Sequence, residues 1–105
     1  MEDKDRYMAV LKSVREKEHY LEEFVKRHSE ELRDLIGTFK MLAEELLWDL
    51  YDQVLEDLSV EQVDEELENL IRDTLRNAWT KALNNPLLYT REFDFVQSLR
   101  YDIDF

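Results

Sequence analysis

Apolar residues recur at alternating three- and four-residue steps through the first half of the chain, which is the spacing of a heptad repeat. The apolar positions are Tyr7, Leu11, Val14, Leu21, Val25, Leu32, Leu35, Phe39, Leu42 and Leu46. Glu18 and His28 are the polar residues that fall in the same series. A stripe this long and narrow is typical of a helix that packs lengthwise against another helix, in the same chain or in a second copy.

The stripe predicts a first helix over about residues 4–36, with a coiled-coil-like character. Oppositely charged residues four apart, such as Glu22 and Lys26, support an exposed helix away from the stripe. Gly37-Thr38 leaves two alternatives open. Glycine commonly follows a helix end and threonine caps the next helix, which favours a turn. The unbroken phase of the stripe favours a continuous helix instead.

A second helix is expected over about residues 38–58, where a wider apolar face replaces the narrow stripe. That face consists of Leu46, Leu47, Leu50, Tyr51, Val54, Leu55 and Leu58, with Trp48 at its edge. At 100° per residue, Glu45, Asp49, Asp52 and Glu56 gather on the opposite side. We call these four carboxylates the acidic face.

The third helix is predicted over about residues 59–84. Ser59 and Gln62 have the spacing of a capping box, and acids fill the following turn. Asn84-Asn85-Pro86 ends the helix, because proline forces the residue before it out of the α region. The expected buried stripe is Val63, Leu67, Leu70, Ile71, Leu75, Ala78, Ala82 and Leu83.

The last segment, residues 87–105, is rich in aromatic residues and is expected to form a short helix or an extended element. Its aromatic residues are Tyr89, Phe93, Phe95, Tyr101 and Phe105. So much apolar surface seldom stays in water. The segment is therefore expected either to fold back over the bundle or to dock on a partner or a sister subunit.

These elements predict a single all-α domain, residues 1–105, built as a bundle of three long helices and a C-terminal element. One glycine and one proline leave little turn chemistry for a β-rich fold. The chain has no cysteine for disulfides or thiolate metal sites. Neither a bilayer-spanning apolar run nor a signal peptide is recognisable, so we expect a cytoplasmic protein without a membrane partner.

The net charge of −12 is concentrated in the middle of the sequence. Residues 37–70 contain Lys40 as their single base against 11 acids, whereas residues 71–105 contain five of each. A field of this kind repels nucleic acid and anionic membranes, and it attracts basic proteins or cations. The expected partner is a protein with a basic surface.

The heptad stripe also predicts a homodimer. The self-association positions are Leu11, Val14, Glu18, Leu21, Val25, His28, Leu32 and Leu35. Pairing two copies antiparallel about residue 23 brings Glu18 opposite His28, and polar residues at such positions commonly set register. The alternative is that both face solvent or other helices of the same chain.

Two patterns point toward metal chemistry. The string Glu16-Lys17-Glu18-His19 contains Glu-x-x-His and resembles the iron-binding motif of ferritin-like proteins, although helical phase turns Glu16 and His19 away from the stripe. Three acid pairs resemble the magnesium sites of all-α nucleotide pyrophosphohydrolases: Asp49 with Asp52, Glu61 with Asp64, and Glu65 with Glu68. In that interpretation Arg72, Arg76 and Lys81 would meet phosphates.

The pattern as a whole favours a non-catalytic interaction module of the adaptor, chaperone or inhibitor type, with no cofactor or metal. It would bind its basic partner through the acidic face and self-associate through the first helix. One alternative is a nucleic-acid mimic like those encoded by phages and archaeal viruses, since spaced carboxylates can imitate a phosphate backbone. The other is a carboxylate metal-dependent enzyme.

Overall fold

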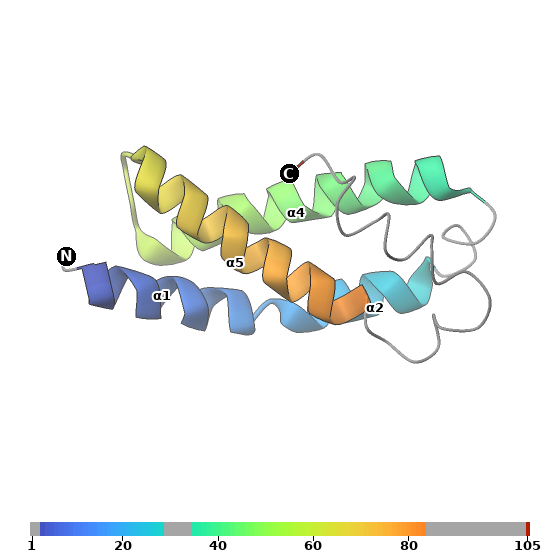
Figure 1. Cartoon of the computed structure of the whole chain (residues 1–105), viewed down its shortest axis with the longest axis horizontal. Coiled ribbons are helices and arrows are strands. Elements are labelled where there is room, and N and C mark those ends of the chain that lie inside the picture. The colour runs from blue at the N-terminus through green and yellow to red at the C-terminus, as the bar shows by residue number, and fades with distance from the viewer. Residues whose placement is uncertain (1–2, 29–34, 84–104) are drawn as a thin grey trace.

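The computed structural model describes residues 3–28, 35–83 and 105, and their regular structure is entirely helical (Figure 1). The helices are α1 (Asp3–Arg15), α2 (Glu18–Arg27), α4 (Ile36–Leu58) and α5 (Glu65–Leu83). The all-α prediction is confirmed for this part of the chain. Among the same residues, no helix is both long and apolar enough to cross a bilayer.

The helices form an elongated bundle with extents of 46 × 21 × 20 Å. Helices α1 and α2 follow one another along one side, and α4 runs back along the other (Figure 1). Helix α5 crosses diagonally and contacts α1, α2 and α4. The described bundle thus has three long segments, and the first of them is divided into helices α1 and α2.

The core is centred on aromatic residues from three helices. Trp79 and Phe39 are almost fully buried, with ring centroids 5.9 Å apart, and Phe24 lies 5.2 Å from Phe39. Aliphatic residues extend the core along the bundle: Val10, Val14, Leu21, Val25, Leu47, Leu50, Val54, Leu67, Ile71, Leu75 and Leu83. Each fully buried side chain of this size contributes roughly 1.5–3 kcal/mol, so these contacts dominate the stability of the fold.

The prediction of one helix over residues 4–36 is wrong, because the chain turns at Glu16 and Lys17. The Lys17 N–H donates to the Val14 carbonyl at 2.9 Å, three residues back, which tightens the end of α1. Helix α2 then begins at Glu18. Apolar periodicity did not reveal the break, since Val10, Val14, Leu21 and Val25 reach the same core on both sides of it.

Both alternatives for Gly37 are also corrected. Leu35 has φ −138° and ψ 61°, so no continuous helix runs through this point. Helix α4 starts at Ile36, which places Gly37 inside its first turn rather than in a turn between helices. A Cβ added at Gly37 would meet nothing within 4 Å. Residues 29–34, with Leu32 of the heptad stripe, lie outside the described residues.

The end of α4 at Leu58 agrees with the sequence, but Ser59 has a different role from the one predicted. It does not cap the following helix. With φ 53° and ψ 40° it is the left-handed residue that closes α4, and its N–H donates to Glu56 O at 3.0 Å. The Val60 N–H reaches Leu55 O at 3.4 Å, and both side chains pack on the core, which completes a Schellman motif.

Helix α5 therefore begins later than residue 59, and Asp64 is its cap. The Asp64 Oδ1 accepts the Leu67 N–H at 2.7 Å, and this hydrogen bond is the main reason that the pKa of Asp64 is lowered. Arg6 also contacts the Asp64 carboxylate at 3.2 Å, joining α1 to the start of α5. Val63, expected in the buried stripe, is 38% exposed because it precedes the helix.

The C-terminal element predicted over residues 87–105 lies outside the described residues except for Phe105. That residue is buried against the bundle, so its side chain does fold back. Helix α5 is described as far as Leu83, and the helix end predicted near residue 84 lies outside the described residues.

Candidate interaction surface

The acidic face lies along the solvent side of α4. Its opposite side is anchored by apolar residues, including Ala43, Leu47, Leu50 and Val54, which are buried against the bundle. Because the helix repeats every 3.6 residues, burial of that side turns the acidic face outward. The members Glu45, Asp49, Asp52 and Glu56 are all exposed. Among the described residues, none of these four carboxylates forms a salt bridge.

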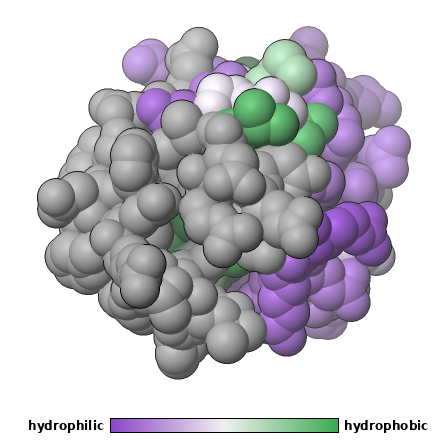
Figure 2. Space-filling model, turned by 90° about the vertical axis from the view of Figure 1, so that its right-hand side faces the viewer, coloured by the Kyte–Doolittle hydropathy of each residue, from purple (hydrophilic) through white to green (hydrophobic). Residues whose placement is uncertain are grey.

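Two large apolar side chains lie exposed beside the acidic face. Met41 is 53% exposed and Trp48 is 40% exposed. They line a shallow hollow together with Glu44, Glu45 and Asp49. Figure 2 views the bundle from the end where α4 begins and shows a small hydrophobic patch near the top of this end, next to hydrophilic residues. The surface thus combines negative charge with apolar area that a partner could cover.

The Trp48 ring is held in place on its inner side. Its centroid lies 5.4 Å from Tyr51 and 4.9 Å from Phe105, both in edge-to-face arrangements. Burial, followed by the negative charge of Glu68, raises the pKa of Tyr51 above its ordinary value. Trp48 is therefore a fixed apolar feature of this surface.

The heptad stripe packs largely inside the molecule. Val14, Leu21 and Val25 are buried, whereas Leu11 is partly buried and Leu35 is 58% exposed. The two polar members also have contacts within the chain. Glu18 lies 3.6 Å from Lys81 of α5, and the His28 ring packs 4.7 Å from Phe24.

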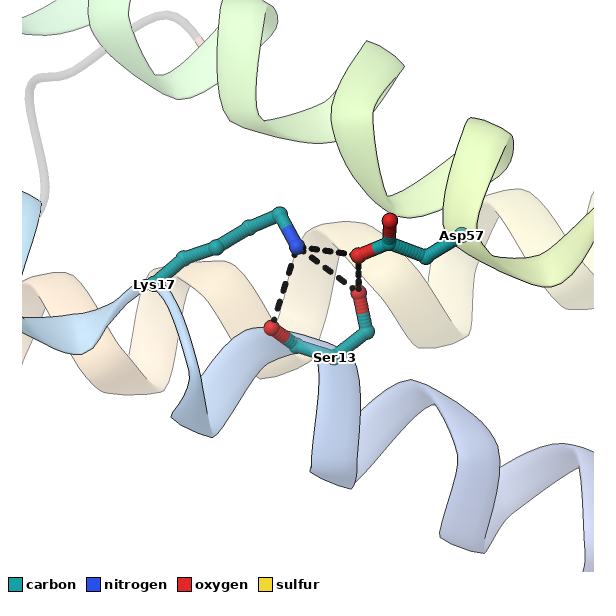
Figure 3. A network of polar contacts seen from close by, with 3 residues as sticks. All are labelled: Ser13, Lys17 and Asp57. Carbon is teal, nitrogen blue, oxygen red and sulfur yellow. Dashed lines mark hydrogen bonds and ion pairs between the residues drawn. The ribbon is translucent and has the colours of Figure 1, made fainter.

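A buried polar network joins the end of α1 to the end of α4 (Figure 3). Lys17 is only 6% exposed, and its Nζ donates to Ser13 Oγ at 3.1 Å, to Ser13 O at 3.3 Å and to Asp57 Oδ2. Ser13 Oγ in turn donates to the same Asp57 oxygen at 2.8 Å. The Lys17 and Ser13 hydrogen bonds lower the pKa of Asp57, in that order of importance.

The geometry of this network suits structure better than nucleophilic catalysis. A serine nucleophile needs a neighbouring base that can take its proton. Here the Lys17 amine is a charged donor to Ser13, held by the carboxylate of Asp57, and Ser13 itself is 4% exposed. The network fixes the break between α1 and α2 by giving the buried ammonium group its acceptors.

The predicted metal constellations are dispersed. Within the described ranges, no group of three or more His, Cys, Asp or Glu residues could hold a metal ion. Glu16 and His19 are both exposed. Asp64 is committed to the cap of α5, and Glu68 lies 3.9 Å from Arg72.

The bases expected to meet phosphates have protein partners instead. Arg72 and Arg76 donate to the Phe105 main-chain oxygen, and Lys81 pairs with Glu18. Their positive charge is therefore directed toward groups of this chain.

Comparison with protein-family models, with curated proteins and with solved structures gave no match to this chain. The assignment of function rests on the surface chemistry described above.

The sequence did not predict the roles of two residues, Trp79 and Lys17, nor one long-range contact, that of Arg72 and Arg76 with Phe105. Trp79, at the centre of the core, was absent from the predicted stripe of its helix. Lys17 was considered only as part of an exposed string. The hydrogen bonds from Arg72 and Arg76 to the Phe105 main-chain oxygen join positions about thirty residues apart, so no local sequence pattern predicts them. The aromatic residue at position 105 was the available signal.

Proposed function

We propose that the protein is a non-catalytic interaction module that binds a partner with a basic surface through the acidic face of α4. The observation that carries this proposal is the pairing of exposed carboxylates with exposed Met41 and Trp48 on one side of the helix. Complementary charge raises the association rate and selects partners, while buried aromatic area supplies much of the affinity. An adaptor, chaperone or inhibitor acting in the cytoplasm would use such a surface.

Self-association through α1 is the second part of the proposal. A homodimer that used the entire heptad stripe would first have to remove Val14, Leu21 and Val25 from the core. The contact proposed here is therefore restricted to the apolar side chains that remain accessible. Tyr7 is 49% exposed and Met8 is 56% exposed, and partly buried Leu11 lies beside them.

A nucleic-acid mimic is the second candidate, favoured by the regular row of carboxylates. The acidic face spans twelve residues of continuous helix, from Glu45 to Glu56, and the eleven steps between its ends rise about 16 Å at 1.5 Å per residue. A mimic would occupy a groove that otherwise holds a phosphate backbone. Its target would release it in the presence of competing DNA or RNA.

Binding to a panel of peptides of equal length tests the first proposal. The peptides differ in net charge and in the presence of an apolar anchor residue, and Trp48 fluorescence reports contact with the acidic face. We expect basic peptides with an apolar anchor to bind most tightly, with affinity that falls as salt rises. Equal binding of acidic and basic peptides would contradict the proposal. If the protein binds a folded nucleic-acid-binding target and duplex DNA displaces it from that target, the result would favour the mimic.

The control for this experiment is calorimetry on the unsubstituted chain, with a Trp48→Phe chain to show how much of the fluorescence change comes from Trp79. Trp79 is buried in the core and responds to unfolding rather than to surface contact. Agreement between the two readouts shows that the signal reports binding at the surface.

A further inference from the structure

Helix α1 has a shallow apolar hollow of its own, which we call the α1 hollow. Its lining residues are Met8, Ala9, Leu11, Lys12, Arg15 and Glu16. Two bases and one acid make this lining positive. The hollow around Met41 and Trp48, which we call the α4 hollow, has three acids and no base in its lining. The surface of one chain thus carries two apolar hollows of opposite charge.

The charged groups of both hollows are available to a partner. Lys12 and Arg15 are exposed, and neither forms a salt bridge with another described residue. Glu45 and Asp49 of the α4 hollow are exposed in the same way. Exposed ion pairs add little affinity, but they select and orient a partner.

Apolar side chains of both hollows can supply the affinity. Met8 is 56% exposed, Met41 is 53% exposed and Trp48 is 40% exposed. Covering side chains of this size removes apolar surface from water, and aromatic residues commonly dominate the energy of an interface. Each hollow therefore has an apolar centre and charges that the other one complements.

The two hollows also match in length and spacing. Residues 8–16 and 41–49 each extend over eight helical steps, a rise of about 12 Å at 1.5 Å per residue. Lys12 and Glu45 are the middle positions of the two stretches. They oppose one another when the stretches are aligned in either direction.

The remaining charges favour antiparallel alignment. In that direction Met8 lies beside Trp48, and Glu16 lies at the end away from Asp49. Parallel alignment would bring Glu16 against Asp49, and like charges in contact are unfavourable. The antiparallel direction therefore pairs apolar with apolar residues and base with acid.

The hollows face solvent on different helices and do not meet within one molecule. Helix α1 approaches α4 of its own chain through Ser13, whose Oγ donates to Asp57 at 2.8 Å. Met8 and Lys12 are exposed and lie away from that contact. The two helices lie on different sides of the bundle (Figure 1), so the complementary surface has to come from a second copy.

We propose that the α1 hollow of one chain docks antiparallel on the α4 hollow of a second copy, with Lys12 against Glu45 and Met8 against Trp48. The inference rests on the proposed function, because it names a second copy as a partner of the acidic face. It also specifies that α1 meets α4, rather than another α1. The contact is head to tail, so a pair joined by one contact leaves one hollow of each kind open.

Two full-length variants test this contact, one for each hollow. Met8→Glu places a negative charge where the acids of the α4 hollow would approach. Met41→Lys places a positive charge where Lys12 and Arg15 would approach. In sedimentation equilibrium we expect each variant alone to associate at least about tenfold more weakly than the unsubstituted chain. An equimolar mixture should recover a 1:1 pair, because each variant retains the hollow that the other has lost.

NMR identifies which hollow is filled in the mixture. When the Met8→Glu chain is isotopically labelled, the unlabelled Met41→Lys chain should shift the Trp48 indole signal. When the labels are exchanged, the Leu11 amide signal should shift and the Trp48 signal should not.

The matched controls are Asn77→Glu and Asn77→Lys, at an exposed position of α5. They make the same changes in net charge and should associate like the unsubstituted chain. Both methionines are more than half exposed, so we expect circular dichroism to show unchanged helicity. If either variant loses helicity, Met8→Ala and Met41→Ala replace the pair, since alanine favours helix.

Three results would overturn the inference. They are a Met41→Lys chain that still pairs with itself, a mixture that does not pair, and an unsubstituted chain that is monomeric. The first would indicate contact between two α1 helices. Binding of basic peptides to a chain that gives any of these results would leave the proposed function standing while removing the second copy as a partner.

Discussion

Lys17 shows how one side chain decides local structure. A buried ammonium group is costly unless it is paired and hydrogen-bonded, and Lys17 reaches acceptors on both Ser13 and Asp57. Asp57 remains about half exposed, with 46% of its side chain accessible. Water therefore screens part of the interaction from that side, and its contribution is smaller than that of a fully buried pair.

The pH dependence of stability should report this pair. The folded state lowers the pKa of Asp57, so the carboxylate adds stability above its unfolded pKa of about 3.9. That contribution disappears as the pH falls through the lower folded pKa. We expect Asp57→Asn to reduce the free energy of unfolding at pH 7 by about 1 kcal/mol and to flatten its decline in acid. Urea titrations between neutral pH and pH 2 measure both effects.

Asp73→Asn is the matched control, because Asp73 is exposed and the substitution makes the same charge change. It should follow the acid dependence of the unsubstituted chain. If Asp57→Asn does so as well, the Lys17–Asp57 pair does not contribute as described.

At the scale of the helices, the boundary between α4 and α5 gives a prediction in which the two possible roles of Ser59 have opposite signs. A non-glycine residue in the left-handed region is strained, whereas glycine adopts it freely. We expect Ser59→Gly to raise the free energy of unfolding by about 0.5–1 kcal/mol in urea denaturation. If Ser59 instead capped the following helix, the same substitution would lower the free energy of unfolding by a few tenths of a kcal/mol. Destabilisation by Ser59→Gly would therefore show that Ser59 caps the following helix, as the sequence predicts.

The helices and the end of α4 at Leu58 could be predicted from the sequence, but the break at Lys17 and the start of α5 could not. Apolar periodicity reports which way side chains face, so it identified most of the buried residues of α4 and α5, although not Trp79, and the exposed acidic face. Apolar periodicity did not detect the turn at Lys17, because the stripe residues before and after the turn pack into the same core. Serine and aspartate are both residue types that commonly cap helices. Because Ser59 closes α4 in a Schellman motif, Asp64 caps α5 instead.

The candidate site was predictable to a similar extent. Helical phase alone placed Glu45 and its partners outward and Trp48 at the edge of the apolar face. The packing of Phe105 against the Trp48 ring depends on tertiary contacts. So do the hydrogen bonds that Arg72 and Arg76 of α5 donate to the Phe105 main-chain oxygen. These features emerge only when distant segments meet.

At the scale of the whole molecule, self-association through the accessible apolar residues of α1, namely Tyr7 and Leu11 of the heptad stripe and neighbouring Met8, can be tested through the oligomeric state. Met8→Glu places a charge among Tyr7, Met8 and Leu11 without touching the core. We expect sedimentation equilibrium to show a dimer for the unsubstituted chain and a monomer for Met8→Glu, with unchanged helicity. A monomer for both would remove self-association from the proposal. Asn77→Glu, at an exposed position of α5, adds the same single negative charge and is the control.

Folding and the proposed recognition use separate surfaces of α4. The side toward α1 and α5 supplies the core, and the acidic face supplies none of it. Neutralising the acidic face should therefore preserve the fold. It should even relieve some repulsion in a chain with a net charge of −12.

The most direct test of the central claim is the salt dependence of binding to a basic peptide with an apolar anchor, measured for three chains. The first is unsubstituted. The second carries Glu45→Gln, Asp49→Asn, Asp52→Asn and Glu56→Gln. The third has the same change in charge at exposed positions elsewhere, through Glu22→Gln, Glu23→Gln, Glu66→Gln and Asp73→Asn. We predict that only the second chain loses most of its affinity and its salt dependence. Equal losses in the second and third chains would show that net charge, rather than the acidic face of α4, governs binding.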